Sequence, residues 1–172
     1  MHVGDTVYPV ITIRSLKSHE GLLLKHLRLS ALKESPDAFS PTWEETAVHD
    51  DEYWVKSAAR IATSPHFDIL IAEHDGEAVG LVSGQIDDAG VGHIGAMWAD
   101  PGIRGKGIGR RLLQQVMTYL QDNDAHTIEL TVTETNRPAI SLYQSAGFEF
   151  TGNDVPLRET SLLMNREMIL SM

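Results

Sequence analysis

Three glycines at alternate positions, Gly105, Gly107 and Gly109, separate an apolar segment from an amphipathic one. The segment before them, Ile94 to Ala99, is apolar or glycine throughout, and apolar side chains recur at helical spacing after them to about Gln121. Glycine adopts backbone angles that other residues resist, so the main chain can turn tightly and approach a ligand closely. The pattern predicts a strand, a tight turn and a helix whose first N–H groups are free at the turn.

The turn carries positive charge although the chain is acidic, with a net charge of −10. Free N–H groups and the positive end of a helix dipole, with cations nearby, suit a pyrophosphate. Two common phosphate motifs are excluded, because no Lys-Ser or Lys-Thr follows a glycine and the spacing breaks Gly-x-Gly-x-x-Gly. Four cations lie within eight residues: Arg104, Lys106, Arg110 and Arg111.

The remaining pattern is Arg-x-x-Gly-x-Gly, which runs from Arg104 to Gly109. It resembles the acyl-CoA pyrophosphate motif of the GNAT superfamily of N-acetyltransferases. The segment Asn136 to Phe148 resembles the next motif of that superfamily, Asn-x-x-Ala-x-x-Leu-Tyr-x-x-x-Gly-Phe. Both motifs stand in the order of the family, and together they cover roughly residues 93–152. A plain surface turn is the alternative for the glycine segment taken alone.

Hydrophobic periodicity and turn residues predict an α/β fold in the order β-αα-βββ-α-β-α-ββ, which matches the GNAT layout. We expect a single GNAT-like acetyltransferase domain, residues 1–172, with a mixed, mostly antiparallel sheet of about seven strands flanked by four helices. The expected elements are a strand at Val10–Ile13, a helix capped by Ser18, a helix from Thr42 toward Ala62, strands at Phe67–Glu73, Ala78–Ile86 and Gly92–Ala99, a helix from Ile108, a strand from Ile128, a helix capped by Asn136, and closing strands at Phe148–Phe150 and Ser161–Leu170.

The composition excludes several kinds of functional site and partner. The chain has no cysteine, which excludes disulfides, thiolate zinc sites and a thiol nucleophile. No apolar run approaches a membrane span, and no basic-then-apolar leader opens the sequence, so we expect a cytoplasmic protein without a membrane partner. The acidic balance argues against nucleic acid as a partner, and no metal site is expected.

The resemblance implies that acetyl-CoA is the co-substrate and that the loop Arg104 to Arg110 anchors it. It also implies that the N–H of Met97 faces the acetyl oxygen and that Ala99 pairs with the pantetheine arm, with Trp98 beside them. Asn136 is expected to bond a pantetheine amide, although capping a helix would also explain it. The expected binding residues are Met97, Trp98, Ala99, Arg104, Gly105, Lys106, Gly107, Ile108, Gly109, Arg110, Asn136 and Tyr143.

Acetyl transfer also requires proton transfers. Tyr143 is the candidate acid that protonates the departing thiolate, as the matching tyrosine commonly does in the family; a buried structural tyrosine is the alternative. His93 is the candidate base, because even spacing on a strand places it on the same face as Met97. A strand-end histidine without a role is its alternative, and Glu129 and Glu134 are weaker candidates for the base.

Three functions follow. The first is an acetyl-CoA-dependent N-acetyltransferase that acts on a small-molecule amine or a peptide amine by direct attack in a ternary complex. The second is a non-catalytic acyl-CoA-sensing or regulatory module with the same fold. The third is a nucleotide-binding protein, which ATP or NAD would stabilise. Substrate selection is expected from the loops Pro36–Glu45 and Gly152–Thr160. GNAT proteins often form homodimers, and Ser161–Leu170 is the candidate interface, although no residue requires one.

Overall fold

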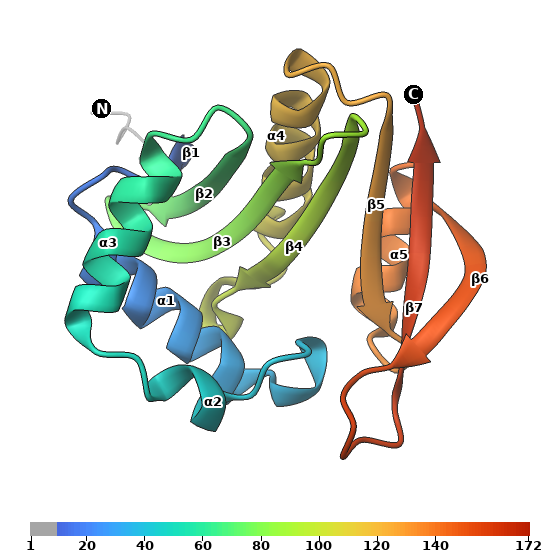
Figure 1. The fold of residues 1–172 in the computed structure, drawn as a ribbon, viewed down its shortest axis with the longest axis horizontal. Helices are drawn as coiled ribbons and strands as arrows, with labels where there is room; N and C mark the ends of the chain where they lie inside the picture. Colours follow the sequence, from blue (N-terminus) through green and yellow to red (C-terminus); the bar gives the residue numbers. More distant parts are fainter. Residues whose placement is uncertain (1–9) are drawn as a thin grey trace, which may run out of the picture.

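A seven-stranded sheet in the order β1-β2-β3-β4-β5-β7-β6 organises the computed structural model, which describes residues 10–172 (Figure 1). Neighbouring strands are antiparallel except β4 and β5, which are parallel. The predicted mixed, mostly antiparallel sheet of seven strands is therefore confirmed. The strands are β1 (Ile11–Ser15), β2 (Phe67–His74), β3 (Glu77–Ile86), β4 (Val91–Ala99), β5 (Thr127–Thr133), β6 (Glu149–Pro156) and β7 (Met164–Ser171).

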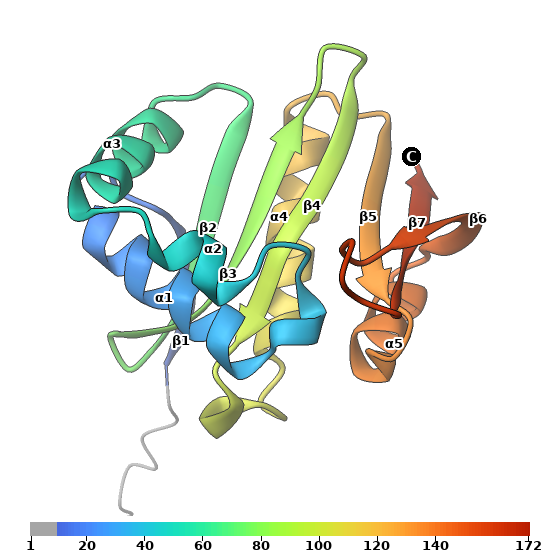
Figure 2. The same cartoon turned by 60° about the horizontal axis from the view of Figure 1, so that its bottom comes forward.

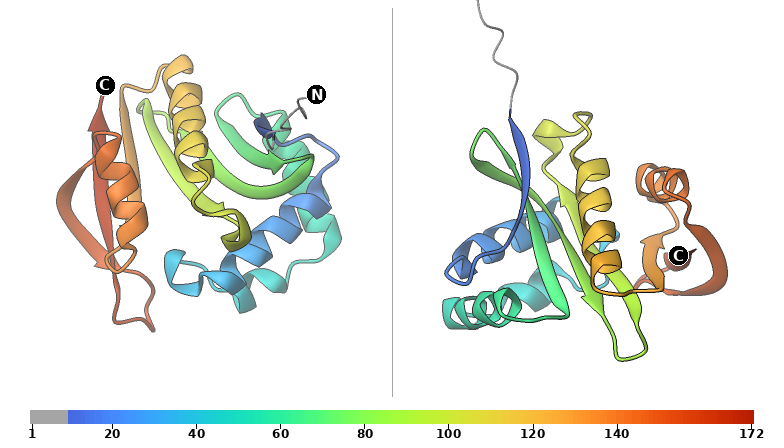
Figure 3. Two further views of the ribbon diagram at one scale, coloured as in Figure 1. Left: turned by 180° about the vertical axis from the view of Figure 1, so that it is seen from behind. Right: turned by 90° about the horizontal axis from the view of Figure 1, so that it is seen from above.

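Helices cover both faces of the sheet and produce two hydrophobic cores. Helices α1 and α3 lie on one face of β2–β4, and α4 and α5 lie on the other face (Figure 3). The first core contains Leu112 and Val116 of α4, and the second contains Leu27 of α1 and Ala58 of α3. The helices are α1 (Gly21–Glu34), α2 (Trp43–Ala47), α3 (Asp51–Ala62), α4 (Ile108–Asp122) and α5 (Arg137–Ser145), with short 3-10 turns at Pro36–Ala38 and Pro101–Ile103.

The prediction of four helices is wrong, because the expected Thr42–Ala62 helix is two helices. Thr42 and Glu45 form the predicted capping box at the start of α2. The Asp50 carboxylate then accepts a hydrogen bond from the Tyr53 N–H at 2.9 Å and starts α3 as a second cap. A side chain that can cap a helix in the middle of a periodic segment is thus enough to divide it.

Ser18 does not cap the first helix. Lys17 and Glu20 close a turn through a backbone hydrogen bond of 3.0 Å, and α1 begins at Gly21 without a side-chain cap. Glu20 contributes differently, because its carboxylate accepts bonds from the Lys17 N–H and from the Arg14 guanidinium. This fixes the connection between β1 and α1.

The closing strands differ from their predicted bounds. β6 continues to Pro156 and includes part of the expected polar loop Gly152–Thr160, whereas β7 begins three residues later than Ser161. β6 forms the outer edge of the sheet, so its polar side chains face solvent and its composition resembles that of a loop. The Arg166 guanidinium of β7 lies 3.7 Å from the centroid of the Phe150 ring and joins the two strands.

The sheet opens between β4 and β5. Their parallel pairing joins only Val91–His93 with Thr127–Glu129. Beyond these residues the two strands separate, as Figure 2 shows. The gap runs along the last residues of β4, which directly precede the glycine turn.

Candidate active site

A bulge in β4 marks the point where the sheet opens. Ser83 of β3 pairs with Gly95 and Leu81 pairs with Trp98, so two residues of β4, Ala96 and Met97, lie opposite one residue of β3. Ala96 has a φ of 52°, an unfavourable angle for a residue with a side chain. Such strain persists where the surrounding structure holds it, and functional sites are common places for it.

The backbone of β4 presents free donors to the gap. The Asp100 N–H donates to the Val79 carbonyl of β3 at 2.7 Å. Because successive N–H groups along a strand point to opposite edges, the N–H groups of Met97 and Ala99 point away from β3. β5 has separated from β4 at this level, so these two groups face the gap.

A pocket of about 220 Å³, which we call the donor pocket, occupies this gap. It brings together six of the predicted binding residues: Met97, Trp98, Ala99, Arg104, Gly109 and Asn136. Its remaining lining residues are Ser35, Ala38 and Phe39 from the segment after α1, and Pro138 from α5.

The glycine turn has the geometry of an anion site at the start of α4. Gly105 and Gly107 have φ angles of 85° and 78°, and a Cβ at either position would meet nothing within 4 Å. The backbone conformation alone therefore demands glycine there. The first helical N–H to bond back is that of Arg111, to the Gly107 carbonyl, so the N–H groups of residues 108–110 have no acceptor within the helix.

The four cations of this segment have different surroundings. The Arg104 guanidinium donates to both carboxylate oxygens of Glu34, at 3.0 and 2.8 Å, and to the Ala99 carbonyl at 3.0 Å. The hydrogen bonds from Arg104, and to a smaller extent those from Ser35 and Trp98, lower the pKa of Glu34 to about 2. Arg111 donates to the Ile11 carbonyl at 2.7 Å. Within the described residues no carboxylate pairs with Lys106 or Arg110, so these two exposed cations are the ones available to a phosphate.

Two predicted residues come from α5. The Asn136 Oδ1 accepts a hydrogen bond from the Ala139 N–H at 3.4 Å and caps the helix, which leaves its Nδ2 group for a ligand. Tyr143 is 6% exposed, and its ring packs against Phe148 with centroids 6.1 Å apart. Burial raises the pKa of Tyr143 to about 12, so its hydroxyl keeps its proton at neutral pH. A protonated hydroxyl can act as an acid, but Tyr143 does not line the donor pocket, and its role stays a prediction.

The expectation that His93 and Met97 share a strand face is wrong. Ile94 belongs to the core on the α4 side and Trp98 to the core on the α1 side, although they are four residues apart. The bulge at Ala96 shifts the alternation by one residue. His93 therefore lies on the face covered by α1 and α3, whereas the Met97 side chain packs toward α4.

The candidate bases have partners of their own. His93 Nε2 lies 2.8 Å from the Asp87 carboxylate, and its Nδ1 lies 3.8 Å from Glu129. The hydrogen bond with His93 lowers the pKa of Asp87. Glu134 accepts a hydrogen bond from the Met164 N–H at 3.0 Å. The choice of His93 as base stays a prediction.

A second pocket, of about 440 Å³, lies under α1 and α3 on the face that carries His93, and we call it the α1–α3 pocket. Ser83 and Ala96 line it from the sheet, and Arg28, Tyr53 and Ser57 are among its helical residues. Sequence reasoning missed these helical residues. A signal was present, because Arg28 follows Leu24 by four residues and precedes Leu32 by four, so a cation stands on the apolar face of the helix.

Neither a metal cluster nor a membrane span is found in the described part of the chain. Among residues 10–172, no group of three or more His, Cys, Asp or Glu side chains could hold a metal ion. None of the helices in the same residues has the length and apolar content needed to cross a membrane.

Curated relatives and solved structures resemble this chain. It is 32% identical over 152 residues to a mycothiol acetyltransferase of Brachybacterium faecium and 44% identical over 57 residues to a streptothricin acetyltransferase of Streptomyces lavendulae. The first match covers 80% of this chain but 45% of the relative, and the second covers 33% and 30%. The chain thus spans less than half the length of these relatives.

The fold resembles that of a GNAT acetyltransferase from Streptococcus pneumoniae, with a TM-score of 0.80 at 20% identity over 95% of this chain and 100% of the other. A putative acetyltransferase from Salmonella typhimurium, solved with its cofactor acetyl-CoA, has a TM-score of 0.76 at 20% identity, covering 94% of each chain.

The model of the acetyltransferase (GNAT) family matches residues 29–148, which include the β4 bulge, the glycine turn and the Asn136 cap. This chain therefore belongs to the GNAT family of acetyltransferases, which use acetyl-CoA as the acetyl donor.

Proposed function

We propose that this protein transfers the acetyl group of acetyl-CoA to a primary amine of a small molecule, by direct attack within a ternary complex. The observation that carries the proposal is the pair of N–H groups of Met97 and Ala99, which face the donor pocket where β4 and β5 separate. The free N–H groups at the start of α4 border the same pocket through Gly109. A thioester and a pyrophosphate thus have separate donors at two ends of one site.

The reaction follows from this arrangement. The amine nitrogen attacks the thioester carbonyl carbon, and the oxygen that becomes negative accepts a hydrogen bond from the Met97 N–H. The carbon–sulfur bond then breaks, the sulfur takes a proton from the Tyr143 hydroxyl, and the second proton that the attacking nitrogen loses restores that hydroxyl. An alkyl ammonium has a pKa of about 10.4, so a base must accept its proton at neutral pH. His93, acting through water, is our candidate for that base.

The names of the relatives support a small acceptor. Two of them are named for mycothiol and streptothricin, which are small molecules rather than proteins. A peptide amine is the other acceptor class that the sequence left open. A cytoplasmic location and a homodimer also stay predictions.

The test is the release of free thiol from acetyl-CoA in the presence of polyamines, amino acids, aminoglycosides and peptides. Because the chain has no cysteine, a thiol reagent reports only the CoA set free. We expect release with small-molecule amines. Stabilisation by acetyl-CoA without release for any amine would contradict the enzyme and favour the sensing module. The absence of both would contradict the donor pocket itself.

A further inference from the structure

The α1–α3 pocket contains an arginine whose charge is uncompensated. The Arg28 Nη1 group is buried and has no hydrogen-bond partner among residues 10–172. Its guanidinium carbon lies over the Phe39 ring, 5.0 Å from the ring centroid. Burial lowers the pKa of Arg28. A buried cation without an anion is unfavourable, so a ligand that supplied the anion would gain from pairing with it.

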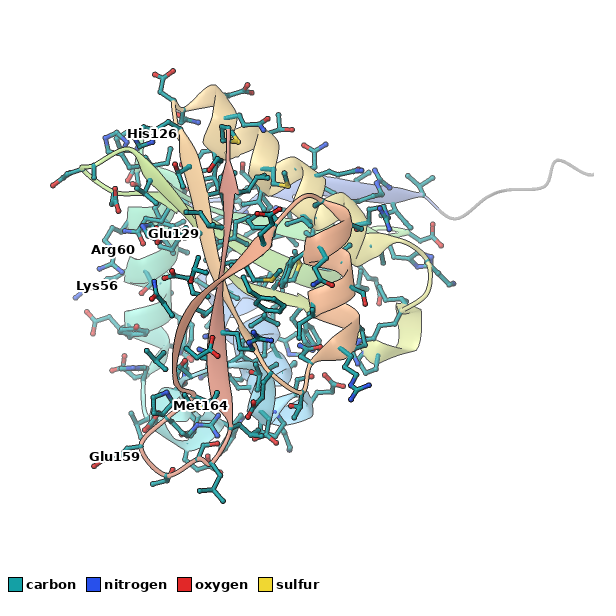
Figure 4. The ribbon with its side chains drawn as sticks, turned by 90° about the vertical axis from the view of Figure 1, so that its right-hand side faces the viewer. Lys56, Arg60, His126, Glu129, Glu159 and Met164 are labelled. Atoms are coloured by element: carbon teal, nitrogen blue, oxygen red, sulfur yellow. The ribbon has the colours of Figure 1, made fainter. Side chains whose placement is uncertain are left out.

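The pocket as a whole has the opposite charge to the chain. Arg28 and Arg60 both line it, and no Asp or Glu is among its lining residues. The chain contains 24 acidic residues against 14 Lys and Arg, so an acid-free pocket with two arginines is a marked local departure. Arg60 comes from α3, where it projects to the same side as Lys56, one turn earlier (Figure 4).

Further donors and an aromatic wall complete the pocket. The Trp54 Nε1 group is buried without a hydrogen-bond partner in the described residues, and Ser57 and Ser83 add hydroxyl groups. His49 and Tyr53 stack with their ring centroids 3.8 Å apart and line the same pocket. The wall can therefore hold an organic group while the donors hold an anion.

Adjacent residues of the β4 bulge line the α1–α3 pocket and the donor pocket. Ala96 lines the first and Met97 lines the second. Adjacent α-carbons are about 3.8 Å apart, so the part of the α1–α3 pocket at Ala96 lies close to the N–H group of Met97. The pocket is thus placed to hold the acceptor.

We infer that Arg28 binds an anionic oxygen group of the acceptor, so that the preferred substrates are small amines that also carry a carboxylate or a phosphonate. This inference rests on the proposed function and names its substrate class. The planar guanidinium pairs with the two oxygens of such a group, while the amine lies toward Ala96 and the thioester.

The experiment compares matched acceptors in the thiol-release assay: α-amino acids, aminoalkylphosphonates, and the carboxamides of the same amino acids. Hydrogen bonds to a charged group imply that kcat/KM for an anionic amine exceeds that of its amide by about tenfold to a hundredfold. In Arg28→Met, which keeps an unbranched apolar side chain over Phe39, this ratio should fall to near one. Comparing kcat/KM for the amino acids with kcat/KM for the aminoalkylphosphonates shows which of the two anionic groups the enzyme prefers.

Two controls separate substrate recognition from folding. Lys56→Met removes a cation from the same side of α3, one that pairs with Glu52 at 2.8 Å outside the pocket, and should leave the ratio unchanged. Turnover of the amides by Arg28→Met reports whether that variant is folded. As a binding measurement, the melting temperature of the CoA complex is followed with N-acetyl amino acids and with their amides.

Equal turnover of acids and amides by the wild type, or a ratio that Arg28→Met does not change, would overturn the inference. Failure of every anionic probe to bind or react would also overturn it. The shift of melting temperature with acetyl-CoA then decides separately whether the donor pocket survives, and thiol release with amines that carry no anionic group decides whether the proposed function survives.

Discussion

Two arginines near the site show how the surroundings of a residue determine its role. Arg104 belongs to the motif that indicates phosphate binding, yet its guanidinium is held by Glu34 and by the Ala99 carbonyl. It joins the end of α1 to the end of β4 and frames the donor pocket. Arg28 belongs to no motif, and its charge is unpaired within the described residues. The arginine that belongs to a motif thus stabilises the site, and the arginine outside any motif is free to bind.

Tyr143 gives the prediction at the scale of a single residue. Tyr143→Phe should lower kcat by about a hundredfold or more, because general acid catalysis typically contributes at least that much. The acetyl-CoA dissociation constant should change little, since the ring and its packing on Phe148 remain. With a pKa of about 12, Tyr143 stays protonated up to about pH 10, so any loss of activity between pH 7 and 10 must come from another group. An unchanged kcat would remove Tyr143 from the mechanism.

At the scale of elements, the site depends on two departures from regular structure. The bulge at Ala96 shifts the alternation of β4 by one residue, and the glycine turn with its positive φ angles leads into α4. Just beyond the bulge, the N–H groups of Met97 and Ala99 are exposed because β5 has separated from β4. The N–H groups of residues 108–110 are exposed because the first turn of a helix has no acceptors for them.

A matched pair of glycines tests the turn. Gly107→Ala and Gly76→Ala each place a Cβ in open space at a positive φ, of 78° and 85°. Each should therefore lower the free energy of unfolding by about 1 kcal/mol through backbone strain. Only Gly107→Ala should also weaken acetyl-CoA binding, because Gly76 lies in the turn between β2 and β3. Chemical denaturation and calorimetric titration measure the two effects. Equal acetyl-CoA affinities for the two variants would show that the glycine turn does not bind acetyl-CoA.

At the scale of the whole molecule, the gap between β4 and β5 forms a cleft in the sheet, and one loop crosses this cleft. That loop, Pro36–Ser40, follows α1 on the β4 side of the cleft, yet its backbone carbonyls accept hydrogen bonds from residues on the β5 side. Arg158, beyond β6, donates to the carbonyls of Pro36 and Phe39 at 2.6 and 2.7 Å. Thr133 of β5 donates to the Asp37 carbonyl at 2.6 Å. The two loops expected to select substrates are thus joined to each other.

Arg158→Met should loosen this connection. We expect faster amide hydrogen exchange in residues 36–40 and 157–163, with a loss of about 1–3 kcal/mol in the free energy of unfolding. Arg14→Met is the control, because Arg14 bonds to Glu20 and Glu73 on one side of the cleft only. It should lower stability without raising exchange in the two loops. Unchanged exchange in Arg158→Met would mean that the loops are held by other contacts.

The sequence by itself determined the family, the order of the strands along the chain and the position of the glycine turn. These features depend on local chemistry: glycines that permit positive φ angles, an asparagine that caps a helix, and apolar residues at a strand or helix period. Six predicted binding residues converge on the donor pocket for this reason. The break between α2 and α3 and the extent of β6 were missed, because a cap inside a periodic segment and a polar edge strand resemble other structures.

Only the tertiary structure decided which side chains share a face and which charges are paired. The bulge at Ala96 separates His93 from the Met97 side chain, and a contact between residues 70 positions apart neutralises Arg104. Arg28 became informative because folding buried it without an anionic partner among the described residues. Which side chains pair, are buried or share a face depends on contacts between segments distant in the sequence. Local preferences along the chain do not determine those contacts.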